Sequence, residues 1–340
     1  GVQMQPERII VSRTDRAGDF ILTLPVFREL KKAFPQSCLC AHVRSYTAPL
    51  ARLAGEIDEI ILDDSYPAGL WCSPLAEDFR KKRFDLAVIV HPAGRSVLAT
   101  WRAGIRRRVG RASNVFQLFL NDRRVQKRSR NEKHEFAYNL DLLNGIVPAI
   151  DFLPWSFKLP AQMIADGTAF LARAGMAGCK PVIVHPGHGG SAHNISTAMY
   201  AQLVAGLLQN DVPVLVSLGP NEESLRLQFP APIHGRLAFA SDLPDLAALA
   251  GVFAGCSAFC GGSTGPLHLA AALQLPCAAF FPPVAAMTPK RWGPVGCASL
   301  IIKPEIADCD GRCTSCGSNG CMSRLQIQPA VAWLTGERKK

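Results

Sequence analysis

Apolar segments rich in β-branched residues alternate with helical patterns through the first part of the chain. The apolar segments cover residues 8–13, 37–44, 57–64 and 85–91, and the helical patterns between them cover 22–34, 48–55 and 74–84. Strands that are apolar on both faces and separated by helices are typical of a parallel sheet covered on both sides. The pattern therefore predicts an α/β domain.

The alternation stops in the middle of the chain and then resumes. Residues 147–160 are rich in proline and show no periodicity, which predicts an inter-domain linker. After it, apolar segments at 181–187, 212–220, 257–262 and 277–283 alternate with helical patterns at 196–210, 243–253 and 265–275. We predict two doubly wound, Rossmann-like domains that face each other across a cleft, residues 1–155 and 156–325. Residues 326–340 are expected to form a final helix or tail that packs back on the first domain.

Length and composition agree with two packed domains. The chain has 340 residues, too many for one ordinary core, and 48% are hydrophobic, which excludes a disordered chain. The net charge of +10 favours an anionic partner: nucleic acid, an anionic membrane surface or a phosphorylated substrate. Nucleic acid is disfavoured because no groove-reading or interleaved aromatic element is found. A generically basic protein is the alternative.

The sequence predicts a cytoplasmic protein. No secretion signal is visible at the N-terminus, and the most apolar windows, 246–260 and 267–286, are interrupted by helix-breaking or polar residues. Most of the 12 cysteines are then expected to be small buried hydrophobic residues in a reducing compartment.

Glycine-rich turns follow several predicted strands, where open parallel sheets bind ligands. In "GGSTGP" (261–266) a helix starting at Gly265 leaves its first N–H groups unpaired, so it attracts an anion. Ser263 and Thr264 add hydroxyl donors, or alternatively only cap the helix. No Walker-type lysine follows, and no G-x-G-x-x-G motif opens the first domain, which disfavours a P-loop nucleotidase or a standard dinucleotide enzyme. The glycine-rich turn "HPGHGGSAHN" (185–194) is a second candidate for binding a diphosphate, from the other side.

Four segments resemble glycosyltransferase family 9, the ADP-heptose:lipopolysaccharide heptosyltransferases. They are "RTDRAGDFILTLPVFRELKKAFP" (13–35), "HPGHGGSAHN", "LGPNEE" and "GGSTGPLHLAAALQLP". The resemblance implies a GT-B fold, with the acceptor bound by the first domain and the nucleotide sugar by the second. It also implies inverting transfer of heptose from ADP-heptose to the lipopolysaccharide inner core, with no catalytic metal and no cofactor.

The resemblance assigns the general base to Asp19. A carboxylate in that position can take the proton that the acceptor hydroxyl loses as it attacks the anomeric carbon. The alternative is that Asp19 caps the following helix. Arg13, Asp15 and Arg16 lie on the same turn and would orient Asp19 or meet an acidic acceptor.

The donor site implied by the resemblance lies in the second domain. Its expected diphosphate and sugar contacts are Gly189, Gly190, Ser191, His193, Ser263, Thr264, Gly265 and His268, and Glu222 is expected to bind the nucleoside. Two positions depart from the family pattern. Relatives often carry Asp at the position of Ser263 and Lys or Arg at that of His193, so the donor sugar is less fixed than the fold.

A basic zone at residues 101–134 falls in the domain expected to hold the acceptor. The acceptor-binding residues expected there and on the first turn are Arg13, Arg16, Arg102 and Arg106. Arginine suits the carboxylates and phosphates of an anionic lipopolysaccharide core, and the zone is also expected to contact the anionic inner face of the inner membrane. A solvated basic face is the alternative.

Four cysteines near the C-terminus, Cys309, Cys313, Cys316 and Cys321, follow the spacing C-x3-C-x2-C-x4-C. Such thiols can hold structural zinc or iron, although zinc ribbons pair two C-x2-C knuckles and only one is present. Related enzymes that heptosylate autotransporter proteins carry cysteine-bound iron. Two alternative functions therefore stay open: a family 9 transferase with another donor sugar or a protein acceptor, and a non-catalytic module that binds nucleotide sugar or glycan.

Overall fold

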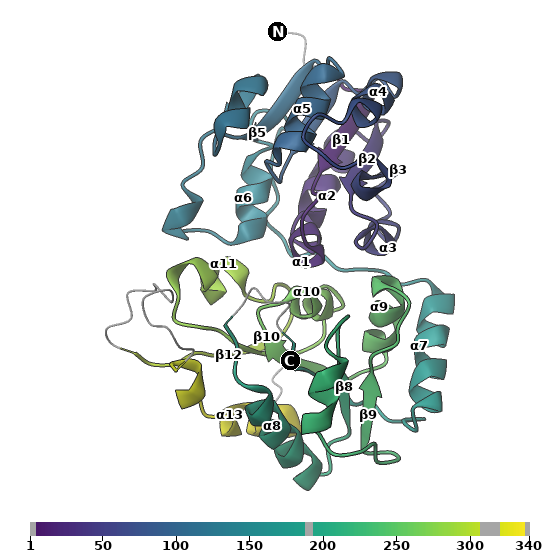
Figure 1. Ribbon diagram of the computed structural model, residues 1–340, viewed down its shortest axis with the longest axis vertical. Coiled ribbons are helices and arrows are strands. Elements are labelled where there is room, and N and C mark those ends of the chain that lie inside the picture. The colour runs from purple at the N-terminus through teal and green to yellow at the C-terminus, as the bar shows by residue number, and fades with distance from the viewer. Residues whose placement is uncertain (1–4, 188–192, 307–319, 337–340) are drawn as a thin grey trace. The chain divides into compact units, whose positions relative to one another are not determined.

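The computed structural model describes residues 5–187, 193–306 and 320–336. The chain divides into two compact units, Gly1–Leu153 and Pro154–Lys340, and each is a parallel sheet with helices on both faces (Figure 1). In the described residues no helix combines the length and apolar character needed to cross a bilayer.

The first unit contains a six-stranded parallel sheet in the order β3-β2-β1-β4-β5-β6. Its strands are β1 (Arg8–Ser12), β2 (Cys38–Val43), β3 (Glu59–Leu62), β4 (Leu86–Ile89), β5 (Arg107–Arg111) and β6 (Asp122–Arg124). The central strand β1 pairs with β2 and β4 in parallel register, Ile9 opposite Leu39 and Leu86. Both of its faces are covered, which explains its unbroken apolar sequence.

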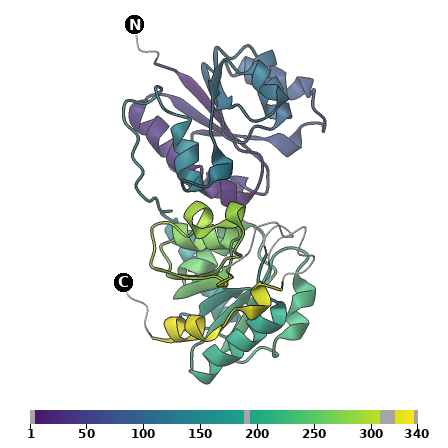
Figure 2. The same ribbon diagram turned by 90° about the vertical axis from the view of Figure 1, so that its left-hand side faces the viewer.

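The helices of the first unit lie on opposite faces of its sheet. They are α1 (Ala17–Ile21), α2 (Leu24–Ala33), α3 (Ala48–Ala51), α4 (Ser73–Lys81), α5 (Gly94–Arg102) and α6 (Glu135–Asp141), with short 3₁₀ turns η1 (Asp63–Ser65), η2 (Val115–Phe119) and η3 (Arg128–Arg130). Helix α2 packs against α6, and α4 packs against α5. Right-handed crossovers in a doubly wound sheet place these pairs on opposite faces, as Figure 2 shows.

The helix predicted at 22–34 is α2, and a separate short helix, α1, precedes it. Leu22 and Thr23 separate the two helices, and Pro25 lies in the first turn of α2, where a missing N–H costs nothing. Helix α1 therefore places residues 17–21 on a helical turn directly after β1.

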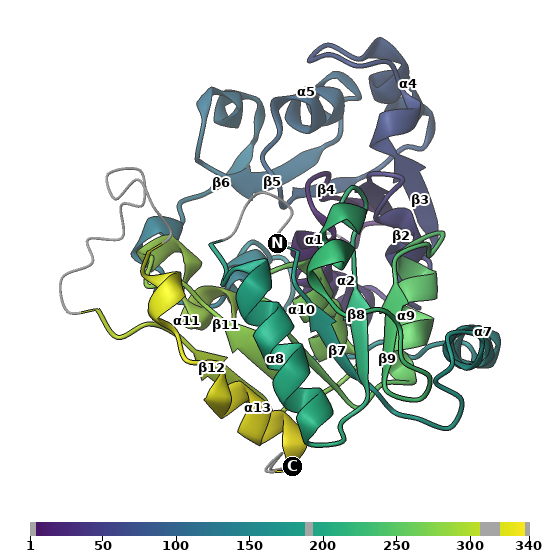
Figure 3. The same cartoon turned by 60° about the horizontal axis from the view of Figure 1, so that its bottom comes forward.

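The second unit repeats the strand order, β12-β11-β10-β7-β8-β9. Its strands are β7 (Val182–His185), β8 (Val214–Ser217), β9 (Leu237–Ala240), β10 (Ala258–Gly262), β11 (Cys277–Phe280) and β12 (Ser299–Ile302). Its helices are α7 (Ala161–Arg173), α8 (Thr197–Gln209), α9 (Leu246–Ala254), α10 (Gly265–Ala272), α11 (Pro289–Trp292) and α13 (Gln328–Thr335), with 3₁₀ turns η4 (Glu223–Gln228), η5 (Ala285–Met287) and η6 (Met322–Arg324). Helix α13 lies beside α8 (Figure 3).

Each sheet reverses its strand order at one place, between β1 and β4 in the first unit and between β7 and β10 in the second. At such a switch point the connections leave toward opposite faces, so a crevice opens outside the carboxyl ends of the two strands. The residues that follow β1, β4, β7 and β10 are therefore the first candidates for function.

Helices α7 and α9 approach each other with their backbones in contact. A Cβ atom at Gly167 would collide with the carbonyl of Gly251, and a Cβ atom at Gly251 would lie 2.5 Å from the carbonyl oxygen of Met163. Only glycine permits this approach, which packs the first helix of the second unit directly on α9.

We predict that Gly167→Ala destabilises the protein, although alanine is favoured by ~1 kcal/mol over glycine inside a helix. The clash should lower the free energy of unfolding by about 1–3 kcal/mol, measured by urea denaturation. Gly336→Ala is the matched control, because nothing lies within 4 Å of its Cβ position and its φ is −157°. Equal stability of the two variants would contradict the close packing of α7 on α9.

Candidate functional site

The turn after β1 is built around the buried guanidinium of Arg13. Its Nε lies 2.8 Å from Asp15 Oδ1 and its Nη2 lies 3.0 Å from Asp15 Oδ2, a bidentate pair. The same Nη2 lies 3.0 Å from Asp19 Oδ1. The backbone N–H of Arg13 donates to the carbonyl of His42 at 3.0 Å. One cation thus holds two carboxylates at the carboxyl end of the sheet.

Asp19 lies inside α1 and does not cap it. The N-cap residue of α1 is Arg16, so the capping interpretation of Asp19 is wrong. The side chain of Asp19 is 16% exposed. Burial raises the pKa of Asp19 to about 6; the positive charge of Arg13 opposes this, and the negative charge of Asp15 adds to it. A carboxylate with this pKa is ionised at neutral pH and basic enough to accept a proton.

A second buried ion pair lies behind the turn. Arg128 Nη1 is 2.5 Å from Glu135 Oε1, and both side chains are almost fully buried. Arg128 also donates to Asn139 Oδ1 at 3.3 Å, and Asn139 Nδ2 donates to the carbonyl of Leu22 at 3.0 Å. These contacts fix the start of α6 against the end of α1. The charge of Glu135 also raises the pKa of Asp19. Sequence reasoning missed Glu135. Its one signal is an acidic residue near the start of "HEFAYNLDLLNGI" (134–146), a segment with helical periodicity.

His91 follows β4 on the other side of the switch point. Its Nδ1 lies 3.4 Å from Asp15 Oδ2. Burial lowers the pKa of His91; the negative charge of Asp15 opposes this, and the positive charge of Arg13 reinforces it. The imidazole is therefore mostly neutral at pH 7 and can both donate and accept a hydrogen bond. Sequence reasoning also missed His91, although a polar residue closing the apolar segment 85–91 was a usable signal.

A chain of polar groups crosses the carboxyl ends of β1, β2 and β3. Ser12 Oγ lies 2.8 Å from His42 Nδ1, and His42 Nε2 lies 2.9 Å from Asp63 Oδ1, which Arg95 Nε also contacts at 3.0 Å. Ser12 and His42 are buried, so no substrate can reach the serine hydroxyl. This Ser-His-Asp arrangement therefore ties three strand ends together beneath Arg13.

The expected acceptor residues separate into two groups. Arg13 and Arg16 lie on the turn with Asp19, and Arg16 is exposed. Arg102 ends α5 and Arg106 precedes β5, so both lie at the amino-terminal edge of the sheet, opposite Asp19. The structure does not bring Arg102 and Arg106 together with the other two.

In the second unit, Glu222 joins the turns after β7 and β8. Its Oε2 accepts the backbone N–H of Gly219 at 2.8 Å. The carboxylate lies so close to Gly187 that a Cβ atom there would collide with it. Asn221, with φ of 65°, turns the chain so that Glu222 points back. The expected nucleoside residue is thus held at the carboxyl edge of the second sheet.

Asn194 joins the turns after β7 and β10. Its Oδ1 accepts the hydroxyl of Tyr200 at 2.7 Å and the N–H of Ile195 at 2.9 Å. A Cβ atom at Gly262 would lie 2.7 Å from Asn194 Nδ2, so glycine is required there. His193 precedes Asn194 and is partly exposed. The predicted contacts Gly189, Gly190 and Ser191 lie outside the described residues.

The first turn of α10 is open to solvent. Thr264 is its N-cap residue, but its side chain makes no capping hydrogen bond, so it is not a simple helix cap. Ser263, Thr264 and Gly265 are all partly exposed, whereas His268, one turn further, is buried. The unpaired N–H groups of this turn and the helix dipole favour an anion. The turn shares the carboxyl edge of the second sheet with Glu222.

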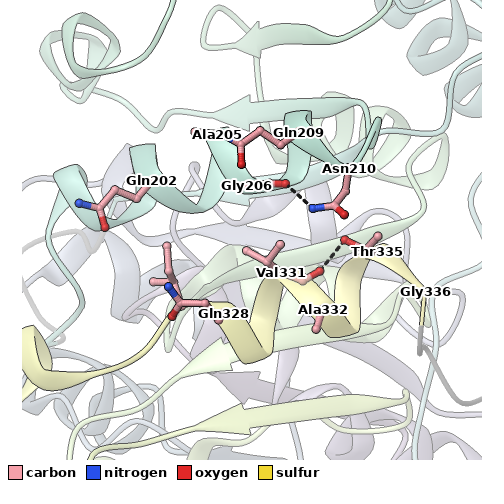
Figure 4. A pocket seen from close by; sticks show the side chains of 11 residues that line it. Gln202, Ala205, Gly206, Gln209, Asn210, Gln328, Val331, Ala332, Thr335 and Gly336 are labelled. Atoms are coloured by element: carbon pink, nitrogen blue, oxygen red, sulfur yellow. Dashed lines mark hydrogen bonds between the residues drawn. The ribbon is translucent and has the colours of Figure 1, made fainter.

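A groove of about 630 Å³ lies between α8 and α13 in the second unit (Figure 4). Its lining has amide and hydroxyl side chains, among them Gln202, Gln209 and Thr335, but no titratable group. It offers neither an acid, a base nor a nucleophile, so it is not a candidate active site.

The sequence left open whether the four C-terminal cysteines bind a structural metal. Cys309, Cys313 and Cys316 lie outside the described residues, and Cys321 lies next to the 3₁₀ turn η6. Within the described ranges, no group of three or more His, Cys, Asp or Glu side chains could hold a metal ion.

Comparison with known proteins links these two edges to one enzyme family. The family model described as glycosyltransferase family 9 (heptosyltransferase) matches residues 73–310. A protein of Haemophilus influenzae that is provisionally named a glycosyltransferase is 33% identical, over 85% of this chain and 86% of its own. Lipopolysaccharide heptosyltransferase 2 of Salmonella typhimurium is 24% identical, over 81% of this chain and 83% of its own.

Solved structures show the same fold. The structure of Escherichia coli ADP-heptose lps heptosyltransferase II superposes with a TM-score of 0.79 at 20% identity, over 98% of this chain and 100% of that one. The prediction of a GT-B-type α/β fold with two Rossmann-like domains is therefore confirmed.

We predict that the carboxyl group of Asp19 titrates near pH 6, about two units above its ordinary value, because it is buried. Carbon-13 NMR of protein labelled at aspartate would follow the titration, and Asp19→Asn would assign the signal by its loss. A midpoint below pH 4.5 would show that Arg13 outweighs burial and would contradict the description of the site.

Proposed function

Because the chain belongs to glycosyltransferase family 9 and is a glycosyltransferase, we propose that it transfers heptose from ADP-heptose to a hydroxyl of the lipopolysaccharide inner core. Two observations support this donor and acceptor: the name of the Salmonella relative and that of the Escherichia coli structure. The single observation that carries the mechanism is Asp19, half-enclosed beside Arg13 at the carboxyl edge of the first sheet.

The proposed reaction is a single displacement. The acceptor oxygen attacks the anomeric carbon of the heptose while its proton passes to a carboxylate oxygen of Asp19. The bond between that carbon and the phosphate oxygen breaks, and ADP leaves with the electron pair. Attack opposite the leaving group inverts the anomeric configuration. Arg13 holds Asp19 in one orientation, and burial sets its basicity.

The proposed donor site uses the carboxyl edge of the second unit. The first turn of α10, with Thr264 and Gly265, would bind the diphosphate through backbone N–H groups. Such preorganised donors stabilise the charge that develops on the leaving ADP. Glu222, held by Gly219, would accept hydrogen bonds from the nucleoside.

Two residues would set the preference for the donor sugar. Ser263 has a hydroxyl where many relatives carry a carboxylate, so it would bind the sugar hydroxyls with a neutral group. His193 would donate a hydrogen bond to the leaving phosphate. We propose that the enzyme acts at the cytoplasmic face of the inner membrane, where the lipid-linked acceptor is available.

The decisive test measures transfer with purified protein and synthetic acceptor, offering ADP-heptose beside ADP-, GDP-, UDP- and CDP-hexoses. The proposal expects turnover with ADP-heptose, and the equilibrium binding of each donor is measured in parallel. Turnover with another donor only would replace the heptose assignment, and donor binding without turnover on any acceptor would indicate a binding module.

Asp19→Asn keeps the shape of the side chain and removes the base. We predict that kcat falls by about 10²–10⁴-fold, because the acceptor proton has no acceptor group. The dissociation constant of the donor should change by less than about twofold, since Asp19 does not bind the ground-state donor. Asp166→Asn, at an exposed position on α7, is the matched control. A kcat of Asp19→Asn within about threefold of wild type would exclude Asp19 as the base.

A further inference from the structure

Large apolar side chains are exposed together on one surface of the first unit. Leu70, Trp71, Trp101, Val115 and Leu118 are each between 43% and 66% exposed. They come from the segment before α4, the last turn of α5 and the 3₁₀ turn η2. Helix α5 packs against both α4 and η2 (Figures 1 and 3). We refer to these five residues as the α5 surface.

Helix α5 connects the segments that carry the α5 surface. Phe116 of η2 lies against the backbone of Gly94 at the first turn of α5, where a Cβ atom would collide with it. Phe119 of η2 lies edge-on to Trp101 at the last turn, with ring centroids 4.9 Å apart. Across the helix, Arg102 Cζ lies 5.4 Å from the ring centre of Trp71. Contiguous exposed apolar area of this kind marks an interaction site, whereas scattered single residues do not.

Trp71 is held in its exposed position by polar contacts. Arg102, whose guanidinium covers the ring, also donates from Nη2 to Ser73 Oγ at 2.9 Å. Arg80 Nη2 donates to the carbonyl of Arg102 at 2.8 Å, which links the ends of α4 and α5. The contacts of Arg102 therefore hold the indole of Trp71 in a position exposed to solvent.

The surroundings of the α5 surface carry several cations. Residues 95–130 contain eleven Lys and Arg residues and one acidic residue, Asp122; of the cations, Arg128 is buried against Glu135 and Arg95 pairs with Asp63. On α4, Glu77 is an exposed acid. The charge of Asp122 is already matched by Arg107 at 2.7 Å and Arg124 at 2.8 Å. Arg80 and Arg106, at the rim of the surface, are exposed. A partner of this surface must therefore combine apolar groups with negative charge.

We propose that the α5 surface binds the interface of an anionic lipid bilayer. Trp71 and Trp101 would enter the headgroup region, where amphipathic aromatic rings are favoured. Arg80, Arg102 and Arg106 would meet the lipid phosphates, and each cation near such a surface adds to the attraction. A shallow apolar contact combined with basic residues is the composition of a monotopic membrane contact.

A second copy of this chain fits the same surface less well. In a two-fold symmetric contact each patch meets its own copy, so the arginines of one protomer would face those of the other. Like charges brought together in this way disfavour the contact. An anionic bilayer satisfies both the apolar residues and the cations.

Helix α5 connects the α5 surface to the site of Asp19 within the first unit. The helix begins at Gly94, three residues after His91, which contacts Asp15, and it ends at Arg102, beside Trp71. Arg102 and Arg106, expected from the sequence to bind the acceptor sugar, would act on the membrane that carries the acceptor.

The proposal rests on the proposed lipid-linked acceptor, but binding to a bilayer requires neither donor nor acceptor. The test is therefore co-sedimentation of the full chain with vesicles of phosphatidylcholine, with and without phosphatidylglycerol. We expect binding only with phosphatidylglycerol, and we expect it to weaken as salt screens the arginines.

Substitutions then locate the contact. Trp71→Ser and Leu118→Ser should each weaken vesicle binding by about tenfold, because each removes an apolar anchor. Leu227→Ser is the matched control, because Leu227 is 89% exposed in the second unit and should leave binding unchanged. Donor binding, measured in solution, shows that all three variants are folded. Transfer to a water-soluble acceptor fragment should also be unchanged in them.

Three results would overturn the proposal: no binding to anionic vesicles, equal loss in Leu227→Ser, or a change of oligomeric state in Trp71→Ser by analytical ultracentrifugation. The last would assign the surface to a second copy. Vesicle binding that depends on Trp71 in a protein without heptosyl transfer would contradict the proposed function and support this inference. Heptosyl transfer by a protein that does not bind anionic vesicles would support the proposed function and contradict this inference.

Discussion

The buried guanidinium of Arg13 is the interaction on which the first unit's site depends. Two carboxylates, Asp15 and Asp19, lie within hydrogen-bond distance of it, at a strand end where water has little access. Without this cation, burial would drive Asp19 further toward its neutral form. With it, Asp19 is an anion at neutral pH whose pKa still stands near 6, the balance that a general base needs.

The second unit has the same strand order as the first, but its site depends on close packing between glycine-rich turns and not on a buried cation. Its turns must let an anion approach the backbone, and glycines allow the turns themselves to lie close together. Glu222 against Gly187 and Asn194 against Gly262 lock the turns after β7, β8 and β10 to each other. This packing leaves the first turn of α10 open, since Thr264 does not fold back to cap it. The same rigid edge can therefore hold a nucleoside and expose donors to its diphosphate.

Much of the fold was predictable because central parallel strands are apolar on both faces and leave a clear signal. Four strands were missed: β6, β9 and β12 lie at sheet edges, and β5 lies next to an edge. Strands β5 and β6 consist mainly of arginines, so they show no apolar pattern. Asp19 became a candidate through its resemblance to a family motif. Glu135 and His91 were missed because they matter through tertiary contacts, Glu135 with Arg128 and His91 with Asp15. A run of basic residues also does not reveal which edge of the sheet each occupies, so the sequence could not separate Arg102 and Arg106 from Arg13 and Arg16.

The central claim is that the ionised carboxylate of Asp19 removes the acceptor proton. The most direct measurement is the pH dependence of kcat/KM for transfer, which reports the ionisation of the free enzyme. The account predicts that kcat/KM decreases by about tenfold per pH unit below about pH 6 and is level above it until other groups titrate. An acidic limb with a midpoint near pH 4, or a rate that does not change between pH 5 and 7, would contradict it.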